Sequence, residues 1–595
     1  MTNRPIVAQP ATLCAAFQET VRVSPDAVAL RTSGDAVTVT WRQYSDRVRA
    51  IAAGLAGLGV GRGDTVALML TNRPEFHLCD TAILHTGATP FSMYNTNPAE
   101  MLAYLFENAS NRVVICERQF LATVQAARRL GGKVEHVVCV DGADEDVRTL
   151  DEVVAAPAAG FDFDAVWPSI GPDDLLTIVY TSGTTGPPKG VELTHRNFIE
   201  NARVVTEFGG MSSDDRVISY LPDAHAANRW LAHYSSLLFG VQITTVADMA
   251  LILPALIEVR PTVFLGVPRL WVKLKAALEA TIDNEPSPLR KRLAHWAIGV
   301  GRARARAASA GRPPGPIDAV RFALADRLVL ARVRAKLGMD RLRMGITGAA
   351  PIPVEVHEFM LGLGVLLCEG WGMSECTAAA SVSRPERIKL GTVGAPVPGA
   401  EVRIAADGEL LVRGPMVMRG YRNDPEKTAE AIDADGWLHT GDIGEIDDEG
   451  YVKIVDRKKE LLINAAGKNM SPANIENALT AYGPLIGTAV AIGDARPYNV
   501  ALICLDPDAV AAFATRNGIP DTSIAALARH PRVRETLQSG VDAANAKLSR
   551  VEQIKKFAVL PEVWEPGSPH LTPTNKLRRK PIAGDYAAVI EELYE

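Results

Sequence analysis

The chain has 595 residues and a net charge of −6, with 47% hydrophobic and 22% charged residues. This length exceeds a single ordinary hydrophobic core, and the balance of apolar and charged residues excludes an intrinsically disordered chain. The net charge gives no support to general nucleic-acid binding, and no apolar run approaches the roughly 20 residues that span a bilayer.

Cysteine usage and the first residues bear on the cellular compartment. No pair of cysteines has the close spacing of a zinc site or a redox motif, and an odd, dispersed set is typical of a reducing cytosol. Met1–Gln18 lacks the charged-then-apolar pattern of a secretory signal. We therefore expect a cytoplasmic protein, with peripheral contact at the inner membrane face left open. The cysteines are Cys14, Cys79, Cys116, Cys139, Cys368, Cys376 and Cys504.

Helical patterns alternate with short apolar runs between residues 45 and 140. Strand–helix alternation of this kind predicts an α/β fold whose mostly parallel sheet is covered by helices. Helices are expected over Val48–Leu58, ending before Gly59, and over Glu75–Thr86. Strands are expected at Thr65–Leu70, Val113–Cys116 and Val137–Val140.

A fourth predicted strand, Leu175–Tyr180, leads directly into a polar glycine-rich loop. Gly183, Gly186 and Gly190 allow tight turns and a close approach of the backbone to an anion. The loop also supplies hydroxyl groups and one mobile positive charge, and it can cradle phosphates through N–H groups and hydroxyls. A flexible surface turn is the alternative, which this density of glycines and donors disfavours. The donors are Thr181, Ser182, Thr184, Thr185 and Lys189.

Residues 289–343 are strongly basic, with 14 Lys and Arg against 3 Asp. A solvated helical pair with basic outer faces is the favoured interpretation. Attraction to anionic lipid headgroups or to acidic CoA is the functional alternative. RNA binding is disfavoured, because no interleaved aromatic residues or nucleic-acid motif accompany the charge.

The last third of the chain first becomes rich in predicted strands. These are Glu409–Arg413, Ile443–Asp447 and Tyr451–Val455, and the turn Asp447–Gly450 predicts a hairpin between the last two. After Asp456 the composition changes to a charged turn and a compact α+β stretch. We therefore predict a large N-terminal domain over residues 1–456 and a small C-terminal domain over residues 457–595.

The glycine loop Tyr180–Val191 resembles the phosphate loop of the adenylate-forming superfamily, which includes acyl-CoA synthetases, peptide-synthetase adenylation domains and beetle luciferases. The remaining motifs of the superfamily follow in the expected order, so the resemblance covers nearly the whole chain. It implies a large domain of layered αβ subdomains with a distorted β-barrel, and a small mobile α+β domain. It also implies that the loop from Thr181 to Lys189 binds ATP, with catalytic roles for Thr185 and Lys189.

Gly370–Thr377 resembles the second nucleotide motif of the superfamily. The resemblance places Trp371 near adenine and Ser374 at the α-phosphate, and makes Glu375 a catalytic Mg²⁺ ligand together with Thr181. Without the resemblance, Glu375 is simply an acid at a helix start. The same nucleotide site takes in Gly370, Gly372 and Met373, and the wall residues Gly348 and Ala349 of Ile346–Pro351.

Three later segments complete the resemblance. Gly436–Asp442 matches the ribose motif, in which Asp442 accepts hydrogen bonds from the ribose hydroxyls. Asp456–Ile463 matches the hinge, with Arg457 at the nucleotide and Lys459 as the pivot. Leu571–Leu577 matches the C-terminal motif, whose Lys576 stabilises charge during attack. The alternatives are a turn aspartate, a solvated charge run and a basic tail. Ile454 would also line the nucleotide site, and Gly467, Lys468 and Asn469 would face CoA.

The substrate is indicated by two further segments. Tyr220–Trp230 resembles the segment that opens the acyl pocket, in which Gly348 also takes part; His225 would cap the carboxylate and Trp230 would gate a tunnel. A satisfied polar core residue is the alternative for His225. Pro261–Trp271, followed by the basic insertion, resembles the long-chain branch. Cys376 is expected to be a packing residue.

The resemblance therefore implies a long-chain fatty acid–CoA ligase that uses ATP, Mg²⁺ and CoA. A fatty acyl-AMP ligase that passes its adenylate to a carrier protein is the first alternative. A catalytically silent acyl- or nucleotide-binding protein is the second, which the intact set of charged residues disfavours.

Overall fold

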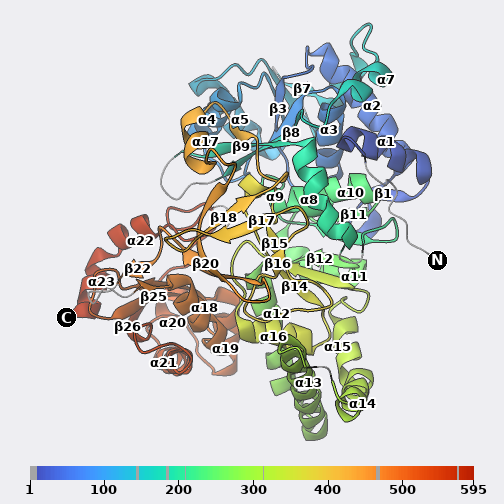
Figure 1. Ribbon diagram of the computed structural model, residues 1–595. Coiled ribbons are helices and arrows are strands. Elements are labelled where there is room, and N and C mark those ends of the chain that lie inside the picture. Colours follow the sequence, from blue (N-terminus) through green and yellow to red (C-terminus); the bar gives the residue numbers. More distant parts are fainter. Residues whose placement is uncertain are drawn as a thin grey trace.

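The computed structural model describes residues 10–142, 147–181, 187–207, 210–312, 314–463, 469–572 and 575–595 (Figure 1). A large body carries the N-terminal, central and β-rich segments, and the C-terminal elements lie together at one side of it. These elements run from α18 (Pro472–Tyr482) to α23 (Ala587–Tyr594). A cleft between the two bodies holds the candidate site.

A five-stranded sheet in the order β4-β3-β5-β6-β7 lies near the N-terminus, and each neighbouring pair of its strands is parallel. The predicted α/β class is therefore confirmed in this region. The short strands are almost wholly buried, as expected where helices cover both faces of a parallel sheet. The strands are β3 (Thr65–Met69), β4 (Thr89–Ser92), β5 (Val113–Cys116), β6 (His136–Cys139) and β7 (Arg148–Thr149). The helices are α2 (Trp41–Gly57), α3 (Pro74–His85), α4 (Ala99–Ala109) and α5 (Arg118–Leu130).

Helix α2 begins at Trp41, well before the predicted start at Val48. The cause is a capping box: the Thr40 side chain accepts the N–H of Gln43, and the Gln43 side chain accepts the N–H of Thr40. This pair satisfies two donors at the helix start that would otherwise lack partners. The predicted end before Gly59 is correct to within two residues.

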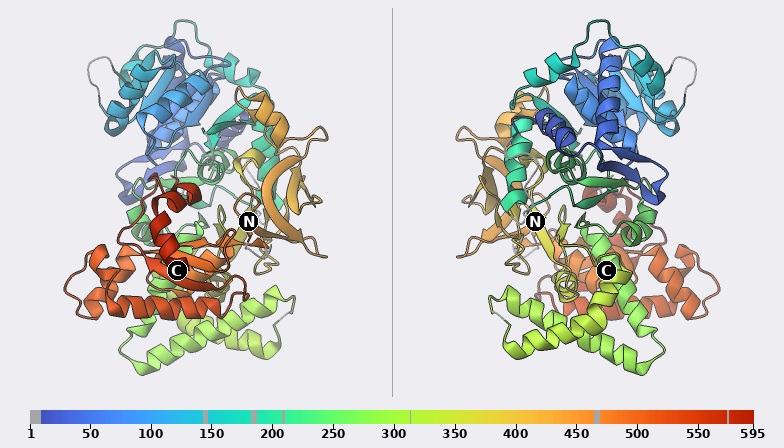
Figure 2. Two further views of the ribbon diagram at one scale, coloured as in Figure 1. Left: turned by 90° about the vertical axis from the view of Figure 1, so that its left-hand side faces the viewer. Right: turned by 90° about the vertical axis from the view of Figure 1, so that its right-hand side faces the viewer.

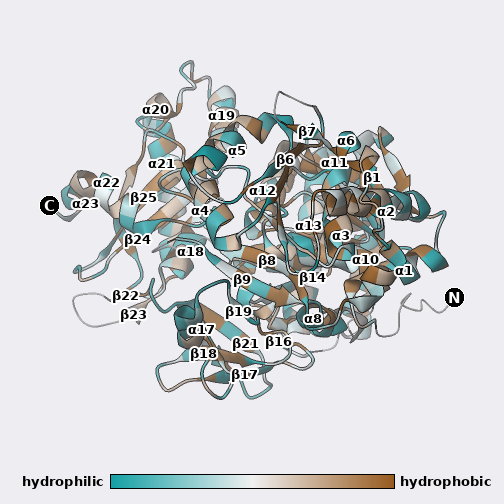
Figure 3. Ribbon diagram, turned by 90° about the horizontal axis from the view of Figure 1, so that it is seen from above, coloured by the Kyte–Doolittle hydropathy of each residue, from teal (hydrophilic) through white to brown (hydrophobic). Residues whose placement is uncertain are grey.

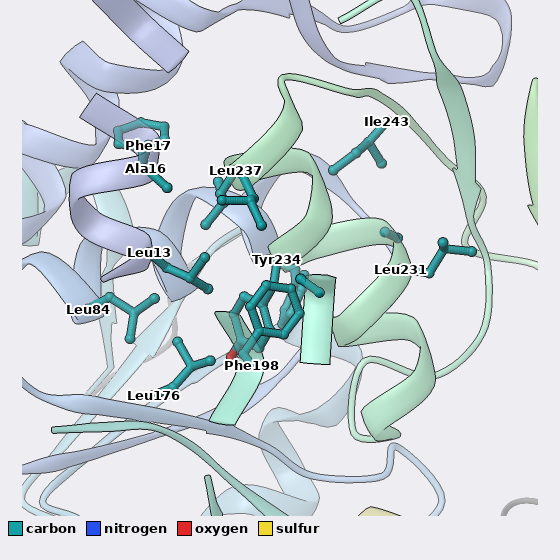
Figure 4. Close-up of a cluster of buried hydrophobic side chains, with 14 of the residues drawn as sticks. Leu13, Ala16, Phe17, Leu84, Leu176, Phe198, Leu231, Tyr234, Leu237 and Ile243 are labelled. Atoms are coloured by element: carbon teal, nitrogen blue, oxygen red, sulfur yellow. The ribbon is translucent and has the colours of Figure 1, made fainter. Parts of the chain in front are cut away.

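Two further sheets form the middle of the large body, in the orders β10-β11-β1-β2 and β12-β13-β14-β15-β16. Their largest shared core includes Phe17, Leu176, Phe198, Leu237 and Ile243, which come from segments far apart in the sequence (Figure 4). Hydrophobic residues likewise concentrate on inner strands such as β8 and β14 when the molecule is seen from above (Figure 3). The strands are β1 (Val28–Thr32), β2 (Thr38–Thr40), β10 (Arg216–Ser219), β11 (Gln242–Thr245), β12 (Val263–Leu265), β13 (Met344–Thr347), β14 (Leu367–Trp371), β15 (Ser381–Val382) and β16 (Ala395–Pro396).

Two antiparallel sheets complete the large body, in the orders β19-β9-β8 and β17-β18-β20-β21. The predicted hairpin is confirmed, because β20 pairs antiparallel with β21 and the N–H of Gly450 bonds the carbonyl oxygen of Asp447 at 2.8 Å. The strands are β8 (Leu175–Thr181), β9 (Lys189–Thr194), β17 (Glu401–Ile404), β18 (Glu409–Arg413), β19 (Gly420–Tyr421), β20 (Leu438–Ile446) and β21 (Val452–Arg457).

The C-terminal body is built around the sheet β24-β25-β26, with the small hairpin β22-β23 at the junction. Its two hydrophobic clusters are formed by residues between Leu462 and Ile590. The strands are β22 (Leu462–Ile463), β23 (Asn469–Met470), β24 (Ile486–Ile492), β25 (Asn499–Leu505) and β26 (Ile554–Val559). The helices between α18 and α23 are α19 (Pro507–Arg516), α20 (Ile524–Leu527), α21 (Pro531–Asn545) and α22 (Arg579–Asp585).

The basic segment forms the predicted helical pair. Helix α13 (Pro288–Ser309) packs against α14 (Pro316–Ala325), which continues through a π-helical turn (Asp326–Leu330) into α15 (Ala331–Lys336). The pair projects from one end of the large body (Figure 2). Among the described residues, no helix combines the length and apolar character needed to span a membrane.

Candidate active site

A cleft of about 2590 Å³ separates the two bodies and is lined by both. It brings together predicted residues that lie more than 390 positions apart, such as Thr181 and Lys576. The other predicted residues along it are Lys189, His225, Trp230, Gly348, Ala349, Gly370, Trp371, Gly372, Met373, Ser374, Glu375, Asp442, Ile454, Arg457 and Lys459.

Some predicted residues lie outside the described parts of the chain. These are Ser182, Gly183, Thr184, Thr185 and Gly186 of the phosphate loop, and Gly467 and Lys468 of the CoA segment. The ends of the phosphate loop are described, because Thr181 and Lys189 are register partners in the antiparallel pair β8–β9. Both of these end residues line the cleft. Asn469 begins β23, and the next residues, Met470 and Ser471, line the cleft.

Lys189, Tyr421 and Glu375 form a chain of contacts on one wall of the cleft. The ammonium of Lys189 donates to the Tyr421 hydroxyl at 3.1 Å and lies 4.2 Å from the centre of its ring. The Tyr421 hydroxyl donates to Glu375 Oε1 at 2.8 Å. Burial lowers the pKa of Lys189, and the Glu375 carboxylate opposes that shift. Burial likewise raises the pKa of Tyr421, so the phenol remains a donor.

Tyr421 was missed at the sequence level. The Gly420–Tyr421 pair precedes a turn and the helix α17 (Pro425–Ala431), so its local pattern predicts a connection rather than a site. Only the pairing of β19 with β9 brings the phenol to the phosphate hairpin. Gly190 helps this approach, since a Cβ there would stand 3.0 to 3.1 Å from Ile178, Tyr180 and Arg422.

Asp442 is the centre of a second polar cluster. The indole N–H of Trp371 donates to its Oδ2 at 2.7 Å, and Arg457 Nε lies 2.8 Å from its Oδ1. Burial raises the pKa of Asp442, while Arg457 and the Trp371 hydrogen bond oppose this shift. Asp442 and Arg457 are neighbours because they are register partners in the β20–β21 hairpin. Strand pairing thus links the ribose and hinge motifs.

Lys576 reaches the same cleft from the C-terminal body. A tight turn presents it: its N–H bonds Thr572 Oγ1 at 3.0 Å, and its carbonyl oxygen accepts the Thr572 N–H at 2.8 Å. The side chain is accessible to solvent within the cleft. Partial loss of water between the two walls lowers the pKa of Lys576, as does the charge of Arg457, whereas Asp442 and Glu375 raise it. Lys576 therefore shares one cleft with the two carboxylates that the sequence singled out, and their charges influence its pKa.

Contacts within the C-terminal body anchor the turn that carries Lys576. Arg579 forms two hydrogen bonds to Glu476, at 2.7 and 2.9 Å, and lies 3.5 Å from Glu460. Side-chain contacts also connect the two bodies. Tyr482 donates to Glu355 at 2.5 Å, and Lys273 lies 3.0 Å from Asp508. Lys459 is exposed and lies between β21 and β22, at the junction of the bodies.

His225 and Trp230 also line the cleft. His225 caps the short helix α9 (Ala226–Asn228), because its Nδ1 accepts the N–H of Ala227 at 3.1 Å. Burial and the charge of Lys576 lower the pKa of His225 to about 4, so the ring is neutral. Trp230 lies in the π-helical turn Arg229–Tyr234 and packs against Phe198. His225 is thus a locally satisfied residue that also lines the cleft.

Cys376 is buried and packs within its own turn, where its Sγ accepts the N–H of Met373 at 3.2 Å. Burial raises the pKa of its thiol to about 12. The position therefore favours packing over nucleophilic chemistry, as expected from the sequence.

The fold and the cleft between its two bodies are those of an adenylate-forming enzyme. Comparison with known proteins identifies the same class. Residues 17–422 match the AMP-binding enzyme family, and residues 459–595 match the AMP-binding enzyme C-terminal domain. The chain belongs to the AMP-binding enzyme family.

Among its relatives, fadD11 of Mycobacterium tuberculosis is 50% identical over 444 residues, covering 75% of this chain and 78% of that protein. The long-chain-fatty-acid–CoA ligase FadD15 of Mycobacterium bovis is 35% identical over 96% of this chain and 95% of its own length. The structure of the anthranilate CoA ligase AuaEII with anthranoyl-AMP has the same fold, with a TM-score of 0.74 and 18% identity, covering 99% of this chain and all of that one.

Proposed function

We propose that the chain is a long-chain-fatty-acid–CoA ligase that consumes ATP and releases AMP and pyrophosphate. One observation carries the proposal: Lys576 of the C-terminal body and the Glu375 and Asp442 carboxylates of the large body line a single cleft. The names of relatives such as FadD15, which align over almost the whole chain, support the same activity.

In the first step, the fatty acid carboxylate attacks the α-phosphorus of ATP and the bond to pyrophosphate breaks. Lys189 and Lys576 both line the cleft and supply positive charge to the developing negative charge, which is electrostatic stabilisation by groups already in position. Asp442 accepts hydrogen bonds from the ribose, and Trp371 lies beside the base. The enzyme thereby contributes positioning and charge, with no nucleophile of its own.

A divalent cation fits at Glu375. Its Oε1 accepts the Tyr421 hydroxyl, and Oε2 has no hydrogen-bond partner within the described part of the chain. The described residues hold no group of three or more His, Cys, Asp or Glu side chains suited to a metal. One carboxylate, the Thr181 hydroxyl, phosphate oxygens and water suit Mg²⁺, which keeps several waters. When bound, Mg²⁺ would neutralise phosphate charge.

In the second step, the C-terminal body rotates about Lys459 and carries Lys576 away from the cleft. Residues 467–469 then face the pantetheine arm of CoA. The thiol sulfur attacks the acyl carbonyl carbon, AMP departs with the electron pair of the broken C–O bond, and the thiol proton passes to water. Polar contacts between the bodies, such as Glu355–Tyr482 and Lys273–Asp508, would break during this rotation.

A panel of fatty acids with ATP and CoA tests this proposal. Thioester, AMP and pyrophosphate are expected in equal amounts, with highest kcat/KM for long chains. Acyl-adenylate that accumulates without thioester would instead support an acyl-AMP ligase serving a carrier protein. ATP binding without pyrophosphate release for any acid would support a silent binding protein.

Replacement of Tyr421 by Phe is expected to lower kcat/KM for adenylate formation by about 10-fold to 100-fold, because the phenol bridges two charged groups. Pyrophosphate release measures the effect. Tyr451→Phe is the matched control, since the Tyr451 hydroxyl bonds the Arg387 carbonyl oxygen at 3.3 Å and does not line the cleft. Equal rates of pyrophosphate release in the two variants would show that Tyr421 has no role in adenylate formation.

We also propose that the α13–α14 pair contacts an anionic membrane surface. Ile317, Val320, Leu324 and Leu328 are 75%, 69%, 50% and 38% exposed, and their spacing places them on one helix face. The exposed Arg321 and Arg327 lie beside this apolar stripe. Exposed apolar residues flanked by arginine are typical of helices that lie in the headgroup region of anionic bilayers.

A triple variant, Ile317→Ser with Val320→Ser and Leu324→Ser, tests this contact. Co-sedimentation with phosphatidylglycerol vesicles should fall by about 10-fold or more, and high salt should weaken wild-type binding. Ile404→Ser is the control, because Ile404 is similarly exposed on the distant strand β17. Binding of the triple variant at the wild-type level would reject the contact, as would no binding by the wild type.

A further inference from the structure

Three buried polar side chains lie beneath the wall formed by Gly348–Pro351. Thr347 on β13 and Glu369 on β14 are register partners in a parallel pair, so their side chains are neighbours on one face of the sheet. His357 comes from the helix α16 (Val354–Gly362) packed against that face. All three are at least nine-tenths buried, and Thr347 and Glu369 line the cleft.

The hydrogen bonds of this group define its chemistry. His357 Nε2 lies 2.7 Å from the Leu367 carbonyl oxygen, which can only accept, so Nε2 carries the proton and Nδ1 carries a lone pair. Nδ1 lies 3.7 Å from Glu369 Oε2, which is beyond hydrogen-bond length, and it has no hydrogen-bond partner among the described residues. On its other side, Glu369 Oε1 accepts the N–H of Ile352 at 3.3 Å. The carboxyl group therefore lies between a donor and an acceptor.

This arrangement suits a protonated carboxyl group. Burial raises the pKa of Glu369 to about 8, and burial lowers the pKa of His357 to about 4, so both are neutral at pH 7. Within the described residues, the structure gives Glu369 no ion pair with Lys or Arg. Glu358, which lies next to His357 on α16, is paired instead with Arg302 and Arg306. A neutral Glu369 would present its proton on the side where His357 Nδ1 has an unpartnered lone pair.

The wall above this group has little freedom. Gly348 approaches β14 so closely that a Cβ would stand 2.9 Å from the Gly370 carbonyl oxygen. Ala349 has a φ of 66°, a conformation that non-glycine residues seldom adopt. The hydrogen bond from Ile352 fixes the far end of the same segment. Glu369 is thus placed to hold the wall from below.

We propose that Glu369 is a positioning residue for the acyl-adenylate pocket, and that it holds the Gly348–Pro351 wall as an uncharged acid between Ile352 and His357. The inference rests on the proposed function, because the wall borders the nucleotide and acyl groups in that reaction. Its consequence is electrostatic. Ionised Glu369 would put a negative charge beside a pocket that takes two anionic substrates, so fatty acid binding weakens as pH rises past about 8.

The variant Glu369→Gln reproduces the neutral acid. Its amide oxygen can accept the Ile352 N–H and its amide N–H can donate to His357, but it cannot ionise. We expect its kcat/KM for the fatty acid at pH 7 to remain within about 3-fold of wild type. Above pH 8 the wild-type KM for the fatty acid should rise toward roughly 10-fold per pH unit, and the variant should lack this rise. Pyrophosphate release without CoA is the measurement.

Two further observations keep the test decisive. Glu369→Leu, which removes the Ile352 acceptor, should raise KM for both fatty acid and ATP by about 10-fold or more while its melting curve still shows a folded protein. Infrared difference spectra between wild type and Glu369→Gln should show a protonated carboxyl band that disappears as pH rises through about 8. The band reports the protonation state of Glu369 whether or not the protein is active. If the protein proves inactive but the band is present, the proposed function fails while the neutral state of Glu369 stands.

Three results would overturn the proposal. The first is a loss of more than about 100-fold in Glu369→Gln at pH 7, which would mean that a charged carboxylate is needed. The second is an alkaline rise in KM that is the same in both proteins. The third is a carboxylate band for Glu369 at pH 7.

Discussion

Replacement of Lys576 by Ala is expected to slow adenylate formation by about 10²- to 10³-fold. The reason is geometric: its ammonium is the group that the C-terminal body brings to the Glu375 and Asp442 carboxylates in the cleft. ATP affinity should change little, because Lys189, Asp442 and Arg457 remain. Pyrophosphate release measures the first step, and calorimetric titration with ATP measures binding.

The same variant should leave the second step intact. Thioester formation from synthetic acyl-adenylate and CoA is expected to stay within about 3-fold of wild type, because Lys576 leaves the cleft before CoA reacts. Lys580→Ala is the matched control, since Lys580 is an exposed lysine on α22 that does not line the cleft. Wild-type pyrophosphate release from Lys576→Ala would refute the assignment of the lysine.

Replacement of Glu375 by Gln is expected to reduce adenylate formation by about 100-fold, since it removes the negative charge that a divalent cation requires. The change keeps an oxygen that can accept the Tyr421 hydroxyl, so the fold of the wall should survive. Rates measured against Mg²⁺ concentration should show a higher half-saturating concentration and partial recovery at high Mg²⁺.

The control for this change is Glu386→Gln, because Glu386 is exposed and does not line the cleft. An unchanged Mg²⁺ dependence in Glu375→Gln would show that the cation is held elsewhere. A variant that fails to melt cooperatively would point to a structural role for the buried carboxylate.

Local sequence patterns were sufficient for much of the fold. The apolar runs at Thr65–Leu70 and Val113–Cys116 predicted β3 and β5 almost to the residue, because buried parallel strands have a strong compositional pattern. The hairpin at Asp447 was equally visible. The early start of α2 was missed because the capping pair Thr40 and Gln43 precedes the apolar periodicity.

The candidate site could be predicted where a motif carried its own chemistry, as at Glu375, Asp442 and Lys576, which all line the cleft. Tyr421 and Glu369 were not found, since each acquires its surroundings from strand pairing. Tyr421 meets Lys189 through the β19–β9 pair, and Glu369 meets Thr347 through the β13–β14 pair. Neither neighbour is close in sequence, so no local pattern could reveal it.

The anchoring of Arg579 has a consequence for engineering. Its partners Glu476 and Glu460 both belong to the C-terminal body, as does the Thr572 turn that presents Lys576. The contacts of Arg579 with Glu476 and Glu460, and the hydrogen bonds between Thr572 and Lys576, would therefore travel with a transplanted C-terminal segment. In a chimera with a relative, the geometry of the lysine should be inherited intact, and compatibility would be decided by the recipient's cleft surface alone.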